Sequence, residues 1–242
     1  GTLGIITEAT LKVMPMPETA KTLMVTFDNL DNTANAVTDI IGSGIIPVAM
    51  ELMDKLTLNA IEDSANLGLD REAEGSLLIE IDGVKEACEK EMNNIIEKVK
   101  NNGAVHIQEA KSELEREKLW TARRSAYGVF AKLAPDIVTE DVTVPVSKVP
   151  IMIRQIIKIA NKYGLKVGVL AHAGDGNMHP MIPANKEDKE EWGKVEAVFS
   201  EIFQAAAGLG GTLSGEHGIG LAKAPYLPFV MNKDTIDFMK KN

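Results

Sequence analysis

The stretch VGVLAHAGDGNMHPMI, residues 167–182, decides how this chain folds around its most unusual side chains. The apolar run 167–171 predicts a short buried strand, and residues 181–182 resume the apolar pattern after the glycines. A spacing of seven would place His172 and His179 on one face of a helix, but the intervening glycines and the following proline disfavour a helix. The pattern therefore predicts a strand–loop–strand hairpin, with His172 closing one strand and His179 opening the next.

Such a hairpin brings two imidazoles close enough to share a cation. Residues that face each other at its base have Cβ atoms about 5 Å apart, and each imidazole can bind an ion at about 2.1 Å. A second glycine-rich stretch, GTLSGEHG at residues 211–218, offers Glu216 as a third ligand and His217 as a proton acceptor. Two histidines and a carboxylate with one open position suit zinc, iron or manganese, so the spacing does not choose the metal.

A structural role for these histidines is the alternative. A single histidine beside glycines is most often a loop or core residue. The chain has four histidines, however, and three of them lie in these two stretches. The fourth, His106, alternates with apolar residues in the strand predicted at 104–108, and we interpret it as structural. The concentration of the other three favours a site.

The two motifs also carry a family resemblance. HAGDGNMHP and SGEHGIG resemble two signatures of the C-terminal domain of FAD-linked 2-hydroxy-acid dehydrogenases, and the similarity extends over essentially the whole chain. That group includes D-lactate dehydrogenases and the flavin subunit of glycolate oxidase, within the vanillyl-alcohol-oxidase-type flavoproteins. The resemblance implies that His172, His179 and Glu216 bind a metal. It also implies that His217 is the catalytic base.

Two further residues enter through this resemblance. Trp120-x-x-Arg123 is similar to a family segment whose arginine holds the substrate carboxylate, a task that suits a planar, bidentate guanidinium. Most helical arginines are solvated or paired, which is the alternative for Arg123. Asn177 is a candidate for orienting ligands or substrate, and a role as a turn residue is equally compatible with its position.

The implied activity is oxidation of a short 2-hydroxy acid, lactate or glycolate, to the 2-oxo acid. Metal-bound substrate would lose its hydroxyl proton to His217, and hydride would pass to the flavin of FAD. The apolar pair Pro180-Met181 favours a short substrate over a dicarboxylic one. An acceptor protein, a quinone or oxygen could take the electrons. The alternative is a metal-binding module or metal-dependent hydrolase without flavin.

The resemblance implies that the chain is a fragment of a larger flavoprotein and inactive by itself. Residues 1–17 are similar to the tail end of an FAD-binding domain, in which Gly1, Thr2, Gly4 and Ile6 would contact the cofactor, although most FAD contacts would come from a missing N-terminal domain. Residues 18–225 form the expected cap or substrate domain. Residues 226–242 hold a helix expected to pack toward the FAD domain.

Composition excludes several classes of protein. The 242 residues carry a formal net charge of −9 and show no basic stripe, so nucleic acid is not an expected partner. No apolar run is long enough for a transmembrane segment, and a cytoplasmic protein is the simplest expectation. The single cysteine, Cys88, lies at helical spacing among apolar residues and is expected in the core.

Strand and helix patterns alternate along most of the chain. Alternation alone predicts a parallel, doubly wound sheet. The resemblance instead implies an α+β, ferredoxin-like cap with an antiparallel sheet and helices on one face. The patterns predict strands at 7–13, 23–27, 45–52, 76–82, 104–108 and 137–146, a helix capped by Asp31 and ended by Gly42, and helices at 54–67, 84–102, 113–133, 150–163, 192–206 and 234–241.

Overall fold

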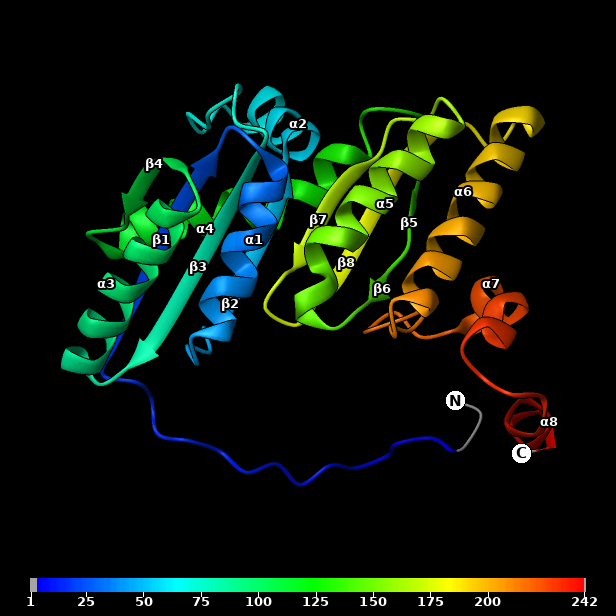
Figure 1. Cartoon of the computed structure of the whole chain (residues 1–242), viewed down its shortest axis with the longest axis horizontal. Helices are drawn as coiled ribbons and strands as arrows, with labels where there is room; N and C mark the ends of the chain where they lie inside the picture. Colours follow the sequence, from blue (N-terminus) through cyan, green and yellow to red (C-terminus); the bar gives the residue numbers. More distant parts are fainter. Residues whose placement is uncertain (1–3, 242) are drawn as a thin grey trace.

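An eight-stranded sheet runs through the computed structural model, which describes residues 4–241 (Figure 1). The strand order is β4-β1-β3-β2-β7-β8-β5, with β6 beside β8, and every ladder among the described residues is antiparallel. The α+β class with an antiparallel sheet is thus confirmed, and the parallel sheet suggested by alternation alone is not formed. The strands are β1 Thr19–Phe27, β2 Ala49–Asp54, β3 Gly75–Gly83, β4 Ala104–Glu109, β5 Asp136–Thr139, β6 Val142–Thr143, β7 Gly168–His172 and β8 Asn177–Ala184.

The helices connect and cover these strands. They are α1 Leu30–Gly42, α2 Lys55–Ala65, α3 Lys85–Asn101, α4 Glu113–Phe130, α5 Val149–Lys162, α6 Lys189–Gly208, α7 Gly220–Lys223 and α8 Lys233–Lys241, with 3₁₀ turns at Val146–Lys148 and Ala224–Phe229. Side chains cap the starts of several helices: Asn29 caps α1, Asp54 caps α2, Asp188 caps α6, and Ser112, which begins the predicted capping-box pattern 112–115, caps α4. The α1 cap is therefore two residues before the expected Asp31.

Two ferredoxin-like units form the sheet. In the first, the chain order β1-α1-β2-α2-β3-α3-β4, with α2 as an added helix between the second and third strands, produces the spatial order β4-β1-β3-β2. The second repeats the pattern with β5 and β6, α5, β7, β8 and α6, and a bridge between Thr143 and Thr212 takes the place of its last strand. The units join where β2 pairs with β7, so the sheet is continuous across them.

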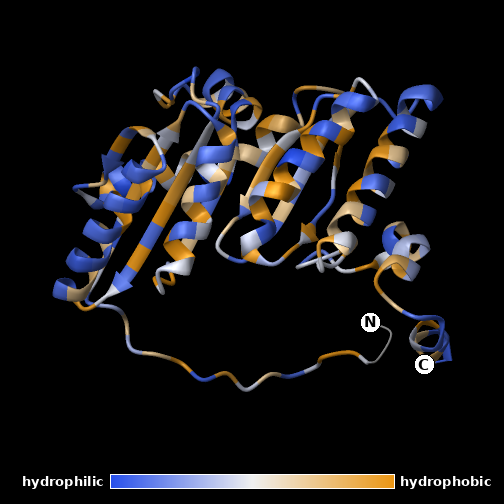
Figure 2. Cartoon of the chain, in the orientation of Figure 1, coloured by the Kyte–Doolittle hydropathy of each residue, from blue (hydrophilic) through white to orange (hydrophobic). Residues whose placement is uncertain are grey.

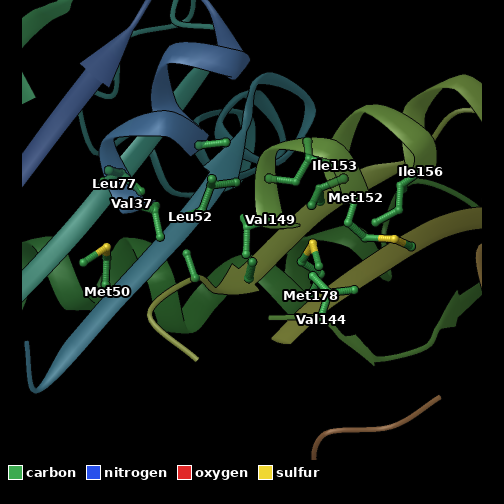
Figure 3. Packing of buried hydrophobic residues seen from close by; sticks show 14 of the residues in the cluster. Val37, Met50, Leu52, Leu77, Val144, Val149, Met152, Ile153, Ile156 and Met178 are labelled. Atoms are coloured by element: carbon green, nitrogen blue, oxygen red, sulfur yellow. The ribbon is translucent and has the colours of Figure 1, made fainter. Parts of the chain in front are cut away.

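The four crossover helices α1, α3, α5 and α6 lie on one face of the sheet, as expected, and share one apolar core with it (Figure 2). The helices α2 and α4 cover part of the opposite face, where a second apolar cluster forms. Figure 3 shows the first core at the junction of the units, where Val37 and Leu52 from one unit face Val149 and Ile153 from the other. Continuous packing across the junction favours folding as one body.

Several predicted boundaries differ from the structure. Residues 4–17 form no strand and are exposed, because alternating apolar residues pair only where a neighbouring strand or apolar surface is present. β2 begins at Ala49 instead of residue 45, and the strand expected at 137–146 is divided into β5 and β6. The sequence predicts Ser147 as the cap of the helix at 150–163, but Ser147 lies in a 3₁₀ turn and does not cap α5.

The two ends of the described chain lie apart from the sheet. Residues 4–17 run as an extended segment along one side of the molecule, and α8 follows the 3₁₀ turn after α7 (Figure 1). Apolar side chains at both ends are exposed, including Ile5, Ile6, Leu221 and Phe238. Within residues 4–241, none of the helices has the length and apolarity required to span a membrane.

Candidate metal and substrate site

The alternation of side chains along the strands collects the site on the face that carries α4. Glu51 of β2 is the direct partner of His172 of β7, and Leu170 of β7 is the partner of His179 of β8. Partners in a ladder point to the same face, and so do residues two apart on one strand. Glu51, His172 and His179 therefore share one face. The two histidines are diagonal neighbours, not the directly facing pair that the sequence suggested, because β8 begins at Asn177.

The imidazoles of His172 and His179 meet Glu216 from the loop after α6. Oε1 of Glu216 lies 3.1 Å from Nε2 of His179 and 3.6 Å from Nε2 of His172. The two rings are 5.2 Å apart and perpendicular, and His217 stacks on His179 with ring centroids 5.1 Å apart. The structure thus brings together all four residues of the predicted metal and base constellation.

The buried carboxylate of Glu51 is in contact with this cluster. Oε1 of Glu51 lies 2.8 Å from Nδ1 of His172, and Oε2 accepts a hydrogen bond of 2.8 Å from Nε of Arg123 on α4. The bond to Nδ1 directs Nε2 of His172 toward Glu216. Glu51 thereby joins a predicted metal ligand to the predicted substrate-binding arginine.

A second buried carboxylate, Asp141, holds the loop that carries Glu216 and His217. Its Oδ2 accepts backbone N–H groups from Gly215, Glu216 and His217 at 2.6, 2.8 and 3.2 Å. The ammonium of Lys223 is also buried and contacts both Asp141 and Glu140. Nδ1 of His217 lies 3.4 Å from Oδ1 of Asp141. Three consecutive N–H groups of this loop are therefore held by one carboxylate.

An open cavity of about 550 Å³ lies over the cluster. Apolar and hydroxyl side chains complete a wall that includes the histidines, Glu216 and Arg123. The lining residues are Arg123, Tyr127, Thr139, Leu170, His172, His179, Met181, Glu216 and His217. The volume is in the range of small-molecule sites.

Two of the three predicted catalytic residues line this cavity, and the third does not. Arg123 and His217 line it. Asn177 lies on the same face opposite His172, but its Oδ1 accepts from Oγ1 of Thr143 at 3.1 Å and its side chain packs beneath Gly215. A Cβ at Gly215 would lie 2.8 Å from Cγ of Asn177. Asn177 is not among the lining residues, and its catalytic role stays a prediction.

The predicted FAD contacts lie far from this cluster in the sequence. Gly1 and Thr2 fall outside the described residues. Gly4 and Ile6 are in the extended, exposed segment, and apart from the neighbours of Gly4 in the chain, no atom of residues 4–241 lies within 4 Å of a Cβ built at Gly4. Their contact with FAD stays a prediction.

Burial and charge set the protonation of the cluster. Burial lowers the pKa of His179 to about 4, which keeps the ring neutral, as a metal ligand must be. The hydrogen bond to Glu51 raises the pKa of His172. Burial opposes ionisation of Glu51, but His172 and Arg123 together hold its pKa below the ordinary value. Asp141 is held ionised in the same manner, since backbone donors and Lys223 outweigh its burial and lower its pKa.

These donors fit a divalent cation. The ligand atoms of His172, His179 and Glu216 all lie within 4.8 Å of one another, and one of the rings is held from behind by a carboxylate. A carboxylate behind the metal-binding imidazole is a common feature of metal centres. A second group, Glu140, Asp141 and His217, is equally compact, but the ammonium of Lys223 already contacts both of its carboxylates.

Sequence reasoning missed Glu51, Asp141 and Lys223. Glu51 interrupts the apolar run of β2, and a charged residue there was a usable signal of a buried ion pair. The other two lie in stretches without a motif, and their meeting across 82 positions depends on the tertiary fold.

One known protein family and several known proteins match nearly the whole of this chain. The model of the family "FAD linked oxidases, C-terminal domain" matches residues 16–241. The glycolate oxidase subunit GlcD of Bacillus subtilis is 46% identical over 99% of this chain, which covers 51% of that protein. The mitochondrial D-lactate dehydrogenase [cytochrome] of Kluyveromyces lactis is 32% identical over the whole chain, which covers 43% of it.

Solved structures agree on the fold. A crystal form of alkyldihydroxyacetonephosphate synthase superposes with a TM-score of 0.60 at 17% identity, over 98% of this chain and 48% of the other. The chain spans about half the length of the curated relatives it matches. Because the family model covers nearly all of the sequence, the chain belongs to the family of C-terminal domains of FAD-linked oxidases.

Proposed function

We propose that this chain forms the substrate- and metal-binding part of an FAD-dependent enzyme that oxidises a short 2-hydroxy acid to the 2-oxo acid. The observation that carries the proposal is the meeting of His172, His179, Glu216 and His217 at one cavity that Arg123 also lines. Family membership supports the flavin, and the names of the relatives support hydroxy-acid chemistry. The same findings give no support to a flavin-free hydrolase.

Each residue has a distinct task in this proposal. His172, His179 and Glu216 hold a divalent cation, which when bound supplies a Lewis acid that lowers the pKa of the substrate hydroxyl. His217 accepts the hydroxyl proton at Nε2, because its Nδ1 is the nitrogen nearer Asp141. The substrate would lose its hydroxyl proton to His217 and a hydride from its α-carbon, and bound FAD would supply the two-electron oxidising power for that loss.

The cavity supports a monocarboxylate with a short side chain. Arg123 is the only arginine or lysine among the lining residues within 4–241, and its Nε already pairs with Glu51. Its other guanidinium nitrogens remain to bind one carboxylate. Leu170 and Met181 offer an apolar wall for a methyl group or a hydrogen, which suits lactate or glycolate better than a dicarboxylic acid.

A substrate screen on the flavoprotein that carries this chain tests the proposal. Anaerobic addition of D-lactate, L-lactate or glycolate should bleach the flavin absorbance, while a 2-hydroxy dicarboxylate should bleach it far more slowly. His217→Gln should lower the rate of bleaching about 10²- to 10⁴-fold, the contribution typical of a general base. Equal rates in the variant and the wild type would remove His217 from the reaction.

The chain alone should not oxidise hydroxy acids. The proposal assigns the redox centre to the flavin domain, so residues 1–242 without added flavoprotein should reduce no dye acceptor in the presence of lactate or glycolate. Turnover by the isolated chain would show that its own residues suffice for the redox step. The metal can be measured on the same preparation, and His172→Ala should contain less of it.

A further inference from the structure

One buried side chain, Glu51, contacts both a predicted metal ligand and the predicted substrate-binding arginine. Its two carboxylate oxygens are each 2.8 Å from a nitrogen, Nδ1 of His172 on β7 and Nε of Arg123 on α4. The carboxylate is 8% exposed, so these contacts are made away from water. We propose that Glu51 is a positioning residue that fixes His172 for the cation and Arg123 for the substrate carboxylate at the same time. The inference rests on the proposed function.

Only an ionised carboxylate can serve both partners. Arg123 offers only donors, and Nδ1 of His172 must be a donor if Nε2 is to keep its lone pair for a cation. Glutamate accepts from both. Glutamine would accept from one and present an N–H₂ group to the other, which leaves a buried donor facing a donor. Loss of the charge therefore frees either the imidazole or the guanidinium.

The position of Glu51 is fixed by the sheet. It lies on β2 directly opposite His172 at the junction of the two ferredoxin-like units, while Arg123 reaches it from the helix above. The cation ligand and the substrate ligand therefore share one anchor, although they are 49 positions apart by residue number. A shift of either partner changes the hydrogen bond available to the other.

The same helix offers a matched control. Arg116, seven residues before Arg123, forms a two-nitrogen ion pair with Glu80 of the neighbouring strand β3. Glu80 has a similarly buried carboxylate, and it also accepts from Thr22 and Trp120, but it contacts no histidine. Loss of the charge at Glu80 removes an anchor of α4 without touching the candidate site.

The test compares Glu51→Gln with Glu80→Gln in the flavoprotein that carries this chain. Manganese ion alone is titrated into metal-free protein by calorimetry, and the KM for the hydroxy acid is then measured with manganese in excess. Glu51→Gln should weaken manganese binding about 10- to 100-fold, the usual effect of removing the carboxylate behind a metal-binding imidazole. Its KM should rise by about tenfold because Arg123 is no longer held. Glu80→Gln should change both values by less than about twofold.

Three results have distinct meanings. Equal effects of the two substitutions on manganese binding and KM would overturn the inference, because Glu51 would then act only as an anchor of α4. If the wild-type protein binds no manganese, zinc or iron at all, the metal assignment of the proposed function fails, and the inference fails with it. If Glu51→Gln does not fold, Glu51→Asp keeps the charge but is one methylene shorter, and manganese binding that equals that of the wild type would overturn the inference.

Discussion

At the scale of single residues, the hairpin between β7 and β8 depends on Gly176. Its φ is +74°, and a Cβ there would lie 2.0 Å from the carbonyl oxygen of Val144. Val144 donates its own N–H to the carbonyl of Gly176 at 3.0 Å, so the two backbones cannot separate without losing that bond. The turn that places His172 and His179 on adjacent strands therefore requires a residue without a side chain.

Gly176→Ala should lower the free energy of unfolding by about 2–4 kcal/mol, from the positive φ and the backbone clash together. Gly174→Ala in the same hairpin is the control, since its Cβ would lie 3.5 Å from Met50, which is an ordinary contact. This substitution should lower the free energy of unfolding by no more than about 1 kcal/mol. Urea denaturation of both variants measures the difference. Similar losses would mean that the backbone at Gly176 relaxes away from Val144.

Lys223 is the buried cation on which the Glu216–His217 loop depends. It is 2% exposed and contacts Glu140 and Asp141, and it donates to the carbonyl of Asp141 at 2.9 Å. Lys223→Met removes the charge and leaves the buried carboxylate of Asp141 without its counter-ion. The expected loss is about 3–5 kcal/mol of unfolding free energy, the range for breaking one partner of a buried pair.

An exposed lysine gives the comparison. Lys194 pairs with Glu190 one turn earlier on the surface of α6, with side chains 43% and 82% exposed, and Lys194→Met should have little or no measurable effect. Thermal or urea unfolding of the two variants separates them. A Lys223→Met protein as stable as Lys194→Met would mean that Asp141 needs only its backbone donors.

At the scale of elements, α2 begins at a carboxylate that is buried and still ionisable. Asp54 caps the helix by accepting from the N–H and the hydroxyl of Thr57, and burial raises its pKa to about 6. The folded state therefore binds a proton between about pH 4 and pH 6 that the unfolded state has released. The contribution of Asp54 to the free energy of unfolding therefore falls as the pH rises through this window.

Asp54→Asn should remove this dependence. Asparagine caps helices about as well as aspartate, so the cap is kept while the titration is lost. Relative to the wild type, the variant should gain stability as the pH rises from about 4 to about 7, by up to about 3 kcal/mol for a shift of about two pKa units. Urea denaturation at several pH values gives both curves. Parallel curves would mean that Asp54 titrates at its ordinary pKa in the folded protein.

The sequence predicts elements well where their signals are local. The capping-box pattern that begins at Ser112 and the alternation at 104–108 are such signals, and the structure confirms the cap and the strand. The strand expected at 7–13 is wrong because alternation reports only that one side can be buried, and no partner strand lies beside it among residues 4–241. The division of residues 137–146 into β5 and β6 depends on pairing with β8, which no local signal contains.

At the scale of the whole molecule, the candidate site lies where the two ferredoxin-like units join. Periodicity alone favours a parallel sheet, and only the family resemblance predicts the antiparallel one. The motifs predict His172, His179, Glu216 and His217 because these residues share two short stretches. Glu51 lies on β2 of the other unit and meets His172 through the β2–β7 pairing, so this contact depends on how the two units associate. That association is set by side-chain packing across the junction, as between Leu52 and Val149, which sequence patterns do not encode.

A cation at this site would tie distant segments together. His179 belongs to the β7–β8 hairpin and Glu216 to the loop after α6, with the whole of α6 between them. Because the unfolded chain cannot hold these ligands together, manganese at about 100 times its dissociation constant should stabilise the folded protein by about 2.7 kcal/mol, or about 5–10 °C in the unfolding midpoint. His179→Ala should lose this shift, whereas His106→Ala, an exposed histidine on β4, should keep it. Scanning calorimetry with and without manganese measures the shift for each protein, and an equal shift in both variants would place the ion elsewhere.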